Sequence, residues 1–368
     1  MCASPTPSTT SKQQAIEQLG ELFLTGFSGL ELSPQSAAFL KDKSIGGVIL
    51  FAHNYDTPAQ VAELINQVQE LRAKLPFWIA VDHEGGRVQR FKKGFTRIPE
   101  AGAIGRSDSP QLAYEISEMM AAELKTVGIN LNFSPVVDIA TNPKNPVIAN
   151  RAYGQTEENV SKISSAVVRG HLTAGVQPCV KHFPGHGDTS TDSHFALPRV
   201  DTDLKTLEAR EFRPFSKAFR SHCSFVMTAH ILMPKLDPKF PATLSPTILR
   251  ELLRKGLRYN RVIVSDDMEM KAITDHYGAE DAPRLALEAG CDLLIYRSEA
   301  AARFAYEALL KALETDKLKP EIVLESADRL RKLKKSVLLP YAPAVVAEVS
   351  QKTGTAENLK IVEQINGA

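Results

Sequence analysis

The chain alternates between short apolar runs and longer amphipathic segments, and this alternation is the feature that most constrains its fold. The longer segments carry apolar residues three and four apart, as one face of a helix does. Strands alternating with helices along one long chain favour a parallel sheet, and eight strand-like runs favour a closed (β/α)8 barrel. The strand-like runs are Leu22–Phe27, Gly47–Phe51, Phe77–Val81, Ile129–Phe133, Val176–Val180, Ser224–Thr228, Arg261–Val264 and Asp292–Tyr296.

Helices are expected between these runs. Ser109-Pro110 and Ser245-Pro246 resemble helix starts. The chain has no dinucleotide-binding fingerprint and no P-loop, which argues against an open nucleotide-binding sheet. The helix-like stretches include Thr57–Ala73, Ser109–Thr126, Glu157–Thr173, Leu204–Ser221, Ser245–Lys255 and Asp281–Glu288.

The length of 368 residues would allow two or three domains, but a (β/α)8 barrel can use this length as a single domain. We expect residues 14–340 to form that single barrel domain. Residues 1–13 are polar and turn-rich, which predicts a disordered tail. Residues 341–368 carry no strand signal and are interpreted as a C-terminal extension.

The composition excludes several classes of partner. Lys and Arg number 44 against 43 Asp and Glu, so the net charge near +1 gives no general attraction to nucleic acid or to a membrane surface. No apolar run approaches the roughly 18 residues of a membrane span.

The cysteines and the N-terminus bear on the cellular compartment. The four cysteines lack metal-type spacing, and three lie in apolar, strand-like stretches, which favours buried thiols and a cytoplasmic protein. The N-terminus lacks the basic and apolar regions of a signal peptide. Cys2, followed by Ser, Pro and Thr, would also suit a trimmed lipoprotein start.

Unusual polar residues cluster directly after the predicted strands. In a (β/α)8 barrel the carboxyl ends of the strands meet at one mouth, and catalysis takes place there. We therefore expect these side chains to share one site. The groups are Asp82–Arg87, Ser134–Asp138, Lys181–His182, His230 and Ser265–Asp267.

The segment Lys181–His194 holds three His, two Asp and one Lys in fourteen residues. Its Pro-Gly-His-Gly centre cannot be a regular helix or a central strand, so it is a loop. Three interpretations stay open for it: a solvated polar loop, a metal site using His182, His186, His194 and an Asp, and a catalytic segment.

The catalytic interpretation requires two roles. Cleavage of a glycosidic bond needs a nucleophile or base below the sugar ring and an acid at the leaving oxygen. Asp266 or Asp267 can supply the first, and His194 the second, because a pKa of about 6.5 suits proton exchange near neutrality. Asp192 could hold the imidazole of His194 in one tautomer. The two aspartates could also cap a helix expected over Met268–Ile273, and both roles are compatible, with Asp267 capping and Asp266 reacting.

The segment Asp82–Arg90 is interpreted as a sugar clamp. Asp82 can accept two hydrogen bonds from hydroxyls, and Arg90 adds charged donors. Gly85 and Gly86 permit close approach of the backbone. A salt bridge at the barrel rim is the alternative for this segment, and Arg151 is equally ambiguous on its own.

Three long motifs carry a family resemblance. They are Asp82–Phe91, Lys181–Gly187 followed by Asp192–His194, and Ser265–Met268. In this order and spacing they resemble the signatures of family 3 glycoside hydrolases of the β-N-acetylhexosaminidase type. The resemblance covers about residues 15–340, and the stretch before Arg151 matches more loosely.

The resemblance implies a TIM barrel and a retaining double displacement without metal or cofactor. It implies Asp266 as the nucleophile and His194, paired with Asp192 on a mobile loop, as the acid/base. Many relatives carry a second domain that supplies a Glu acid, and this chain is too short for that domain. The sugar contacts that the resemblance implies are Asp82, Arg90, Arg151, Lys181 and His182.

The expected function is therefore an exo-acting β-N-acetylglucosaminidase that recycles peptidoglycan by releasing N-acetylglucosamine from anhydromuropeptides. Its partner is a carbohydrate substrate, and no obligate protein partner is implied. Within the family, a phosphorylase or a β-glucosidase is the alternative. Outside it, the alternatives are a metallohydrolase and a sugar-binding barrel without catalysis.

Overall fold

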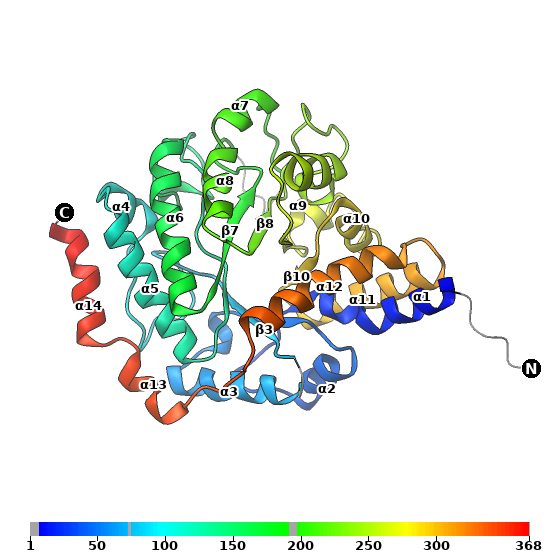
Figure 1. Cartoon of the computed structure of the whole chain (residues 1–368), viewed down its shortest axis with the longest axis horizontal. Helices are drawn as coiled ribbons and strands as arrows, with labels where there is room; N and C mark the ends of the chain where they lie inside the picture. Colours follow the sequence, from blue (N-terminus) through cyan, green and yellow to red (C-terminus); the bar gives the residue numbers. More distant parts are fainter. Residues whose placement is uncertain (1–6, 73–74, 191–196, 368) are drawn as a thin grey trace, which may run out of the picture.

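The eight apolar runs of the sequence form the eight parallel strands of a closed barrel (Figure 1). This computed structural model describes residues 7–72, 75–190 and 197–367. Strand β1 pairs with both β2 and β10, so the expected (β/α)8 barrel is confirmed. Its strands are β1 Phe23–Thr25, β2 Gly47–Leu50, β3 Trp78–Val81, β6 Leu131–Asn132, β7 Gln177–Phe183, β8 Phe225–Thr228, β9 Val262–Asp267 and β10 Leu293–Tyr296.

The barrel interior is a packed core rather than a channel. Trp78 on β3 meets Phe225 on β8 edge to face, with ring centroids 5.0 Å apart, although these strands are not neighbours in the barrel. Both side chains are fully buried, as large side chains inside an eight-stranded barrel should be. The small sheet of β4 His83–Gly85 and β5 Val88–Gln89 follows β3 outside the barrel.

Helices surround the barrel. The expected start at Ser109-Pro110 is present, because Ser109 Oγ accepts a hydrogen bond from Leu112 N and Pro110 opens the helix. None of the helices in the described part of the chain has the length and apolar character that a membrane span requires. The α-helices are α1 Pro7–Gln18, α2 Pro34–Asp42, α3 Pro58–Glu70, α4 Ala101–Arg106, α5 Pro110–Thr126, α6 Glu157–Ala174, α7 Leu204–Ala209, α8 Phe212–Arg220, α9 Lys271–Thr274, α10 Ala282–Ala289, α11 Glu299–Glu314, α12 Pro320–Val337, α13 Val346–Lys352 and α14 Ala356–Glu363.

Other helical types fill some of the connections. The helix expected over Ser245–Lys255 is a π-helix, Thr247–Gly256. The 3-10 helices are Leu19–Leu22, Ala52–Asn54, Ala149–Arg151, Ala242–Leu244 and Gln364–Gly367.

Two expectations about helices are wrong. The stretch Leu204–Ser221 is two helices, because the ring of Pro214 excludes the carbonyl of Arg210, four residues earlier, from a continuous helix. The disordered tail cannot reach residue 13, because α1 begins at Pro7. Helix α1 packs on α11 and α12 and buries Ala15, so tertiary contact orders a segment with little apolar character.

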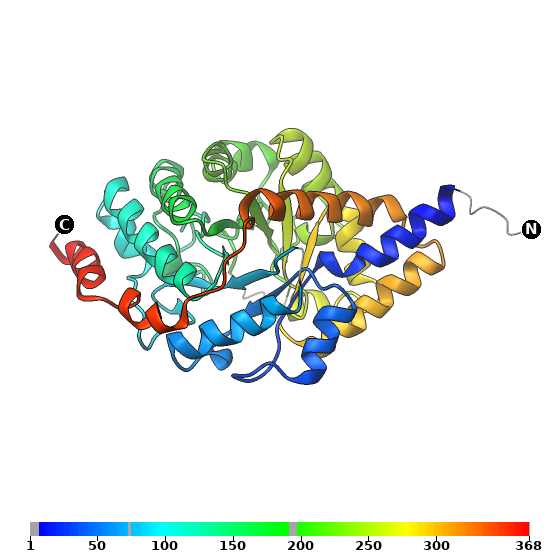
Figure 2. The same cartoon turned by 60° about the horizontal axis from the view of Figure 1, so that its bottom comes forward.

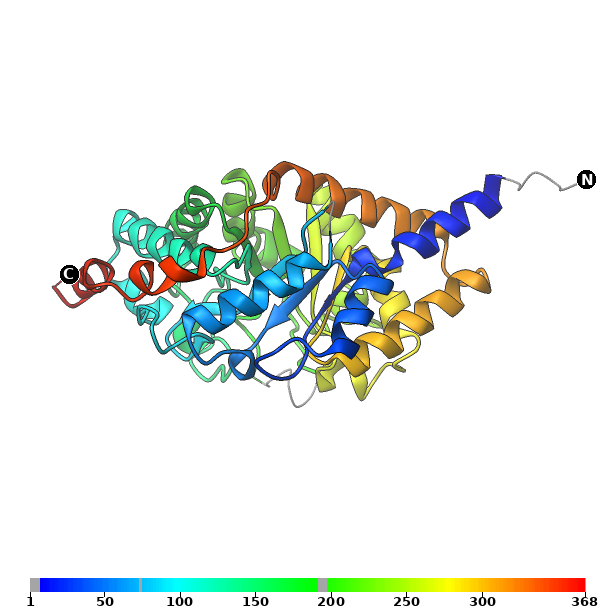
Figure 3. The same cartoon turned by 90° about the horizontal axis from the view of Figure 1, so that it is seen from below.

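The C-terminal extension packs along the barrel wall. Helix α13 lies on α3 and α5, and α14 lies on α5 (Figures 1 and 2). In Figure 3 the chain runs from the end of α12 down past α3 to α13. The extension is therefore a part of the folded structure that joins two neighbouring helices of the barrel.

Candidate active site

The polar groups singled out from the sequence meet at one end of the barrel. They follow or end strands β3, β6, β7, β8 and β9, which are consecutive neighbours in the barrel. Since all these strands are parallel, their carboxyl ends lie on the same face. The expected clustering at one mouth is thus present.

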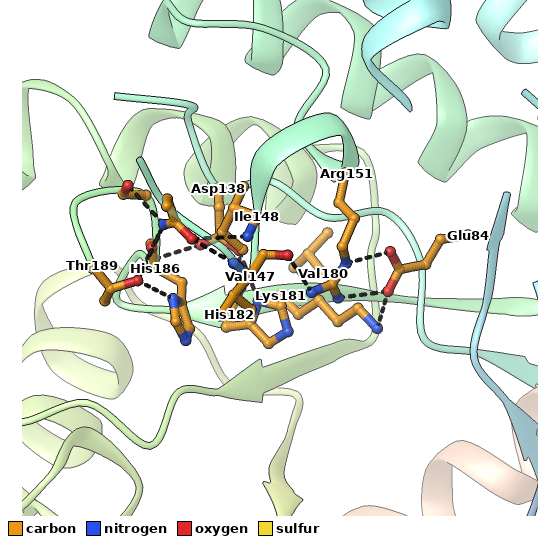
Figure 4. Close-up of polar contacts among 12 residues, drawn as sticks. Glu84, Asp138, Val147, Ile148, Arg151, Val180, Lys181, His182, His186 and Thr189 are labelled. Carbon is orange, nitrogen blue, oxygen red and sulfur yellow. Dashed lines mark hydrogen bonds and ion pairs between the residues drawn. The ribbon is translucent and has the colours of Figure 1, made fainter. Parts of the chain in front are cut away.

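Four of the expected sugar-binding residues, Asp82, Arg90, Arg151 and Lys181, form one ion network with Glu84. Figure 4 shows the part of this network in which Arg151 and Lys181 meet Glu84. Lys181 Nζ lies 2.7 Å from Asp82 Oδ1 and 2.7 Å from Glu84 Oε1. Arg151 donates through Nε and Nη2 to the two oxygens of Glu84, both at 2.8 Å. Arg90 Nη2 lies 3.7 Å from Asp82 Oδ2. The structure therefore brings together residues that are up to 99 positions apart in the chain.

This network is charged although it is buried. Burial alone would raise the pKa of the Glu84 carboxyl, but Arg151 and Lys181 hold that pKa well below its ordinary range. Burial would lower the pKa of Lys181, yet Asp82 and Glu84 raise it above its ordinary value. Fixed charges of both signs can bind sugar hydroxyls, which both donate and accept hydrogen bonds.

His182 is held by a buried carboxylate. Its Nδ1 lies 2.7 Å from Asp138 Oδ2, which also accepts from His182 N at 3.1 Å. The other oxygen, Asp138 Oδ1, accepts from His186 N at 2.6 Å. Burial would raise the pKa of Asp138, but His182 keeps it below its ordinary value. Because an ionised carboxylate can only accept, Nδ1 of His182 carries the hydrogen of this contact.

Asp266 lies at the end of β9 and is partly exposed. Burial would raise the pKa of its carboxyl, but the nearby His230 and His182 keep this pKa below its ordinary value. Asp267 N donates to Asp266 Oδ1 at 2.8 Å, which fixes one oxygen. An ionised, oriented carboxylate at a barrel mouth can act as a nucleophile.

The alternative of a helix cap for this aspartate pair is wrong. Helix α9 begins at Lys271, and its N-cap residue is Met270. Asp267 Oδ1 instead accepts from Glu269 N at 3.0 Å, which closes a tight turn between the strand and the helix. The turn leaves the Asp266 carboxylate outside any helix.

Asp192 and His194 lie outside the described residues. The chain on either side of them is firmly held: Asp188 Oδ2 accepts from Thr202 Oγ1 at 3.0 Å and pairs with Arg210. These contacts bring together the two ends of the segment that contains the expected acid/base pair.

Asn145 ties this segment to the loop that carries Arg151. Its amide donates to His186 O at 2.8 Å and to Gly187 O at 2.9 Å. Its Oδ1 accepts from Val147 N and Ile148 N, both at 2.9 Å. One buried side chain therefore fixes two loops of the mouth relative to each other.

Reasoning from the sequence missed the roles of Glu84, Asp138 and Asn145. The first two stand in the polar groups that follow predicted strands, so their positions carried a signal. What the sequence lacked was the partner of each carboxylate, since Arg151 and His182 are remote in the chain. Asn145 sits in a loop without any motif.

Two hollows help to locate the site. One of about 370 Å³ adjoins the mouth and is lined by Glu84, Arg87, Glu100 and Arg151, among others. A larger one of about 880 Å³ lies on the outside between α6 and α8, and none of the expected site residues lines it. Within residues 7–72, 75–190 and 197–367, no three His, Cys, Asp or Glu side chains are grouped so that they could hold a metal ion.

Comparison with known proteins identifies the class. The family model described as the glycosyl hydrolase family 3 N terminal domain matches residues 14–333. Beta-hexosaminidase A of Pseudoalteromonas piscicida is 35% identical over 361 residues, or 91% of this chain, and this chain spans 60% of its length. The beta-hexosaminidase of Methylococcus capsulatus is 38% identical over 79% of this chain and 86% of its own length.

Solved structures agree. The family 3 β-N-acetylglucosaminidase of Paenibacillus sp. str. FPU-7 matches with a TM-score of 0.89 at 38% identity, over 98% of this chain and 68% of that chain. NagZ of Neisseria gonorrhoeae, solved in complex with N-trifluoroacetyl-D-glucosamine, matches with a TM-score of 0.78 at 30% identity, over 95% of this chain and 97% of that chain.

The chain belongs to glycoside hydrolase family 3. The expected class of enzyme, a glycoside hydrolase of the β-N-acetylhexosaminidase type, is confirmed by this membership and by these relatives.

Proposed function

We propose that this enzyme is a retaining exo-β-N-acetylglucosaminidase that releases terminal N-acetylglucosamine through a covalent intermediate on Asp266. The observation that carries the proposal is the Asp266 carboxylate, which lies next to the last residue of β9, at the same mouth as the charged network around Lys181, and has a pKa below its ordinary value. The first supplies a nucleophile, and the second supplies a binding surface for sugar hydroxyls.

The proposed reaction has two displacements. An Asp266 oxygen attacks the anomeric carbon and forms a glycosyl ester while the glycosidic bond breaks, and His194 protonates the leaving oxygen. Water then attacks the same carbon, gives a proton to His194 and releases the Asp266 carboxylate. Asp192 would orient the imidazole of His194 and stabilise its charged form. The roles of His194 and Asp192 rest on the family resemblance.

The sugar would be held by Asp82, Arg90, Arg151, Lys181 and His182. Asp82 and Arg90 keep partly exposed side chains, with 19% and 34% of their surface accessible, so they can still bond to a ligand. Arg151 and Lys181 are nearly buried and stiffen the network through Glu84. Such a preorganised set would hold one sugar unit in a fixed orientation.

Trapping of the intermediate tests this proposal. A fluorinated N-acetylglucosaminyl donor with a good leaving group should form the ester faster than water cleaves it, because fluorine destabilises the oxocarbenium-like transition state. Peptide mapping should then find one sugar unit on Asp266. A label on another residue would contradict the mechanism, and release of N-acetylglucosamine 1-phosphate only in phosphate buffer would show a phosphorylase.

We further propose peptidoglycan recycling as the cellular role and the cytoplasm as the location. The three cysteines within the described residues are free and buried, which is compatible with a reducing compartment. Incubation of the enzyme with N-acetylglucosaminyl-anhydromuropeptide should release N-acetylglucosamine faster than incubation with chitobiose. The reverse order of rates would contradict the recycling role.

A further inference from the structure

The C-terminal segment, residues 344–367, is linked through one buried carboxylate to the stretch that follows Arg90. The segment is anchored at its start by Asn66, which donates to Ala344 O at 2.9 Å and accepts from Ala344 N at 3.0 Å. Its helices α13 and α14 then pack on α3 and α5. Between these two helices the chain reaches Glu123 on α5, which is 2% exposed.

Glu123 collects four donors from two separate parts of the chain. Thr96 donates through its N at 2.9 Å and through its Oγ1 at 2.6 Å. Gly354 N and Asn358 Nδ2 donate from the C-terminal segment, both at 2.7 Å. A carboxylate is the only protein side chain that accepts about four hydrogen bonds and donates none. The residue type therefore matches the contact.

Thr96 belongs to the stretch that follows the expected sugar-binding residue Arg90. Gln89, directly before Arg90, donates to Thr96 O at 2.9 Å and to Phe91 O at 3.0 Å. The amide oxygen of Gln89, Oε1, accepts a hydrogen bond from Ile98 N at 3.0 Å. The backbone on both sides of Arg90 is thus fixed by hydrogen bonds that lead to Thr96 and so to Glu123.

The C-terminal segment also contacts the stretch after Arg90 directly, at Gly94. A Cβ atom added to Gly354 would lie 2.9 Å from Gly94 O, closer than real side chains approach. Gly354 also has a φ of 62°, which glycine adopts without strain. Contact and conformation both require glycine where the segment meets the loop.

We infer that Glu123 is a positioning residue for substrate binding, and that the C-terminal segment helps it to hold the Arg90 side of the mouth. The inference rests on the proposed function in one respect, namely that Arg90 contacts the sugar. It assigns residues 344–367 a role in affinity for the sugar that the barrel alone does not supply.

The test uses the full-length chain and 4-nitrophenyl N-acetyl-β-D-glucosaminide. Glu123→Gln replaces one carboxylate oxygen by an NH₂ group, which faces the donors of Thr96, Gly354 and Asn358. The stretch after Arg90 should therefore loosen. We expect KM to rise roughly five- to tenfold and kcat to change less than about twofold. Asn358→Ala, at a half-buried position, removes only one donor and should raise KM about two- to threefold. In an Arg90→Ala background both effects should shrink to near unity.

Asn66→Ala is the matched control. It weakens the attachment of the same segment without touching Glu123 or the loop, so it should lower Tm and leave KM unchanged. If Asn358→Ala and Asn66→Ala change Tm and KM alike, or if Glu123→Gln acts equally with and without Arg90, the inference is wrong.

A second readout does not depend on the reaction. Amide hydrogen exchange of residues 88–98 should speed up in Asn358→Ala and not in Asn66→Ala. Unchanged exchange in Asn358→Ala would overturn the inference, even if the wild-type enzyme hydrolyses the substrate. Absence of hydrolysis by the wild type would refute the proposed function alone.

Discussion

The two ends of the barrel each bury a cluster of charges, and only one of these clusters is suited to bind a ligand. At the mouth, Lys181 pairs with Asp82 and Glu84. At the floor, where the strands begin, Lys334 pairs with Glu21 at 3.0 Å and donates to Gly46 O at 2.6 Å. Both lysines are nearly or fully buried.

The two clusters differ in how much of their charged side chains remains exposed. At the floor, Arg72 donates to Glu21 and to Ile45 O, and the Lys334 side chain has no exposed surface, so these charges join α12 to the loops before β1 and β2. At the mouth, the side chains of Asp82 and Arg90 stay partly exposed. A buried ion cluster is therefore no sign of a site by itself. Two properties distinguish a ligand site from a structural cluster: the site lies at the carboxyl ends of the strands, and part of its charged surface stays exposed.

The largest expected effect belongs to Asp266. Asp266→Asn removes the nucleophile but keeps the shape of the side chain, so kcat on an aryl N-acetylglucosaminide should fall on the order of 10⁴-fold. Circular dichroism and Tm should stay near the wild-type values. Asp275→Asn, an exposed position in the same connection, serves as control, and comparable turnover by the two variants would remove Asp266 from the mechanism.

The floor cluster should matter for stability and not for binding. Lys334→Met leaves Glu21 buried with one cationic partner fewer, which should lower the free energy of unfolding by about 3–5 kcal/mol. KM should not change. Urea unfolding measures the loss, and Lys332→Met, an exposed position on the same helix, should stay within about 0.5 kcal/mol of the wild type. A rise in KM for Lys334→Met would blur the contrast between the two ends.

Asp138→Asn should act at the mouth with intermediate strength. One of its two oxygens becomes an NH₂ group, so either His182 or His186 N loses its acceptor. We expect kcat/KM to fall about 10- to 100-fold, equal to about 1.4–2.8 kcal/mol. Nitrogen NMR of the His182 ring should show a changed tautomer. An unchanged ring signal together with lost activity would contradict this explanation. The control is Asp201→Asn at an exposed position, which should leave both the ring signal and kcat/KM unchanged.

The last expected effect is a dependence of stability on pH, with no loss of activity implied. Burial raises the pKa of Asp267 to about 7 from its ordinary value of 3.8. Between these values the folded chain holds a proton that the unfolded chain has lost, so the stability of the wild type should fall as pH rises toward 7. Asp267→Asn cannot titrate and keeps an acceptor for Glu269 N. Urea unfolding at pH 5 and pH 8 should therefore show a larger fall for the wild type, and parallel behaviour would refute the assignment.

Much of the fold could be predicted because the relevant patterns are local. Each strand-like run, for example Gly47–Phe51 or Asp292–Tyr296, overlaps a barrel strand. Strands β7 and β9 extend three residues beyond the predicted ends at Val180 and Val264. Two boundaries of helices were predicted wrongly. Pro214 divides one predicted helix in two, and α1 includes residues that were predicted to be a disordered tail. In both cases the outcome depends on a clash or a packing surface that periodicity does not contain.

The candidate site divides in the same way. The sequence identified Asp82, Lys181 and Asp266 because they follow predicted strands, and it gave no partner for Glu84 or Asp138. Those partners, Arg151 and His182, reach the carboxylates from other strands and loops. Asp192 and His194 stay predictions, because they lie outside the described residues.

By itself, the sequence determined the order of strands and helices, the end of the barrel where polar groups gather, and the family to which the motifs belong. Only the tertiary structure decided which charges pair, that Lys334 is enclosed at the floor, and that residues 344–367 share the carboxylate of Glu123 with Thr96. The physical reason is that hydrophobic periodicity and turn chemistry act between near neighbours in the chain. Ion pairs and shared carboxylates join side chains that closure of the barrel alone brings together.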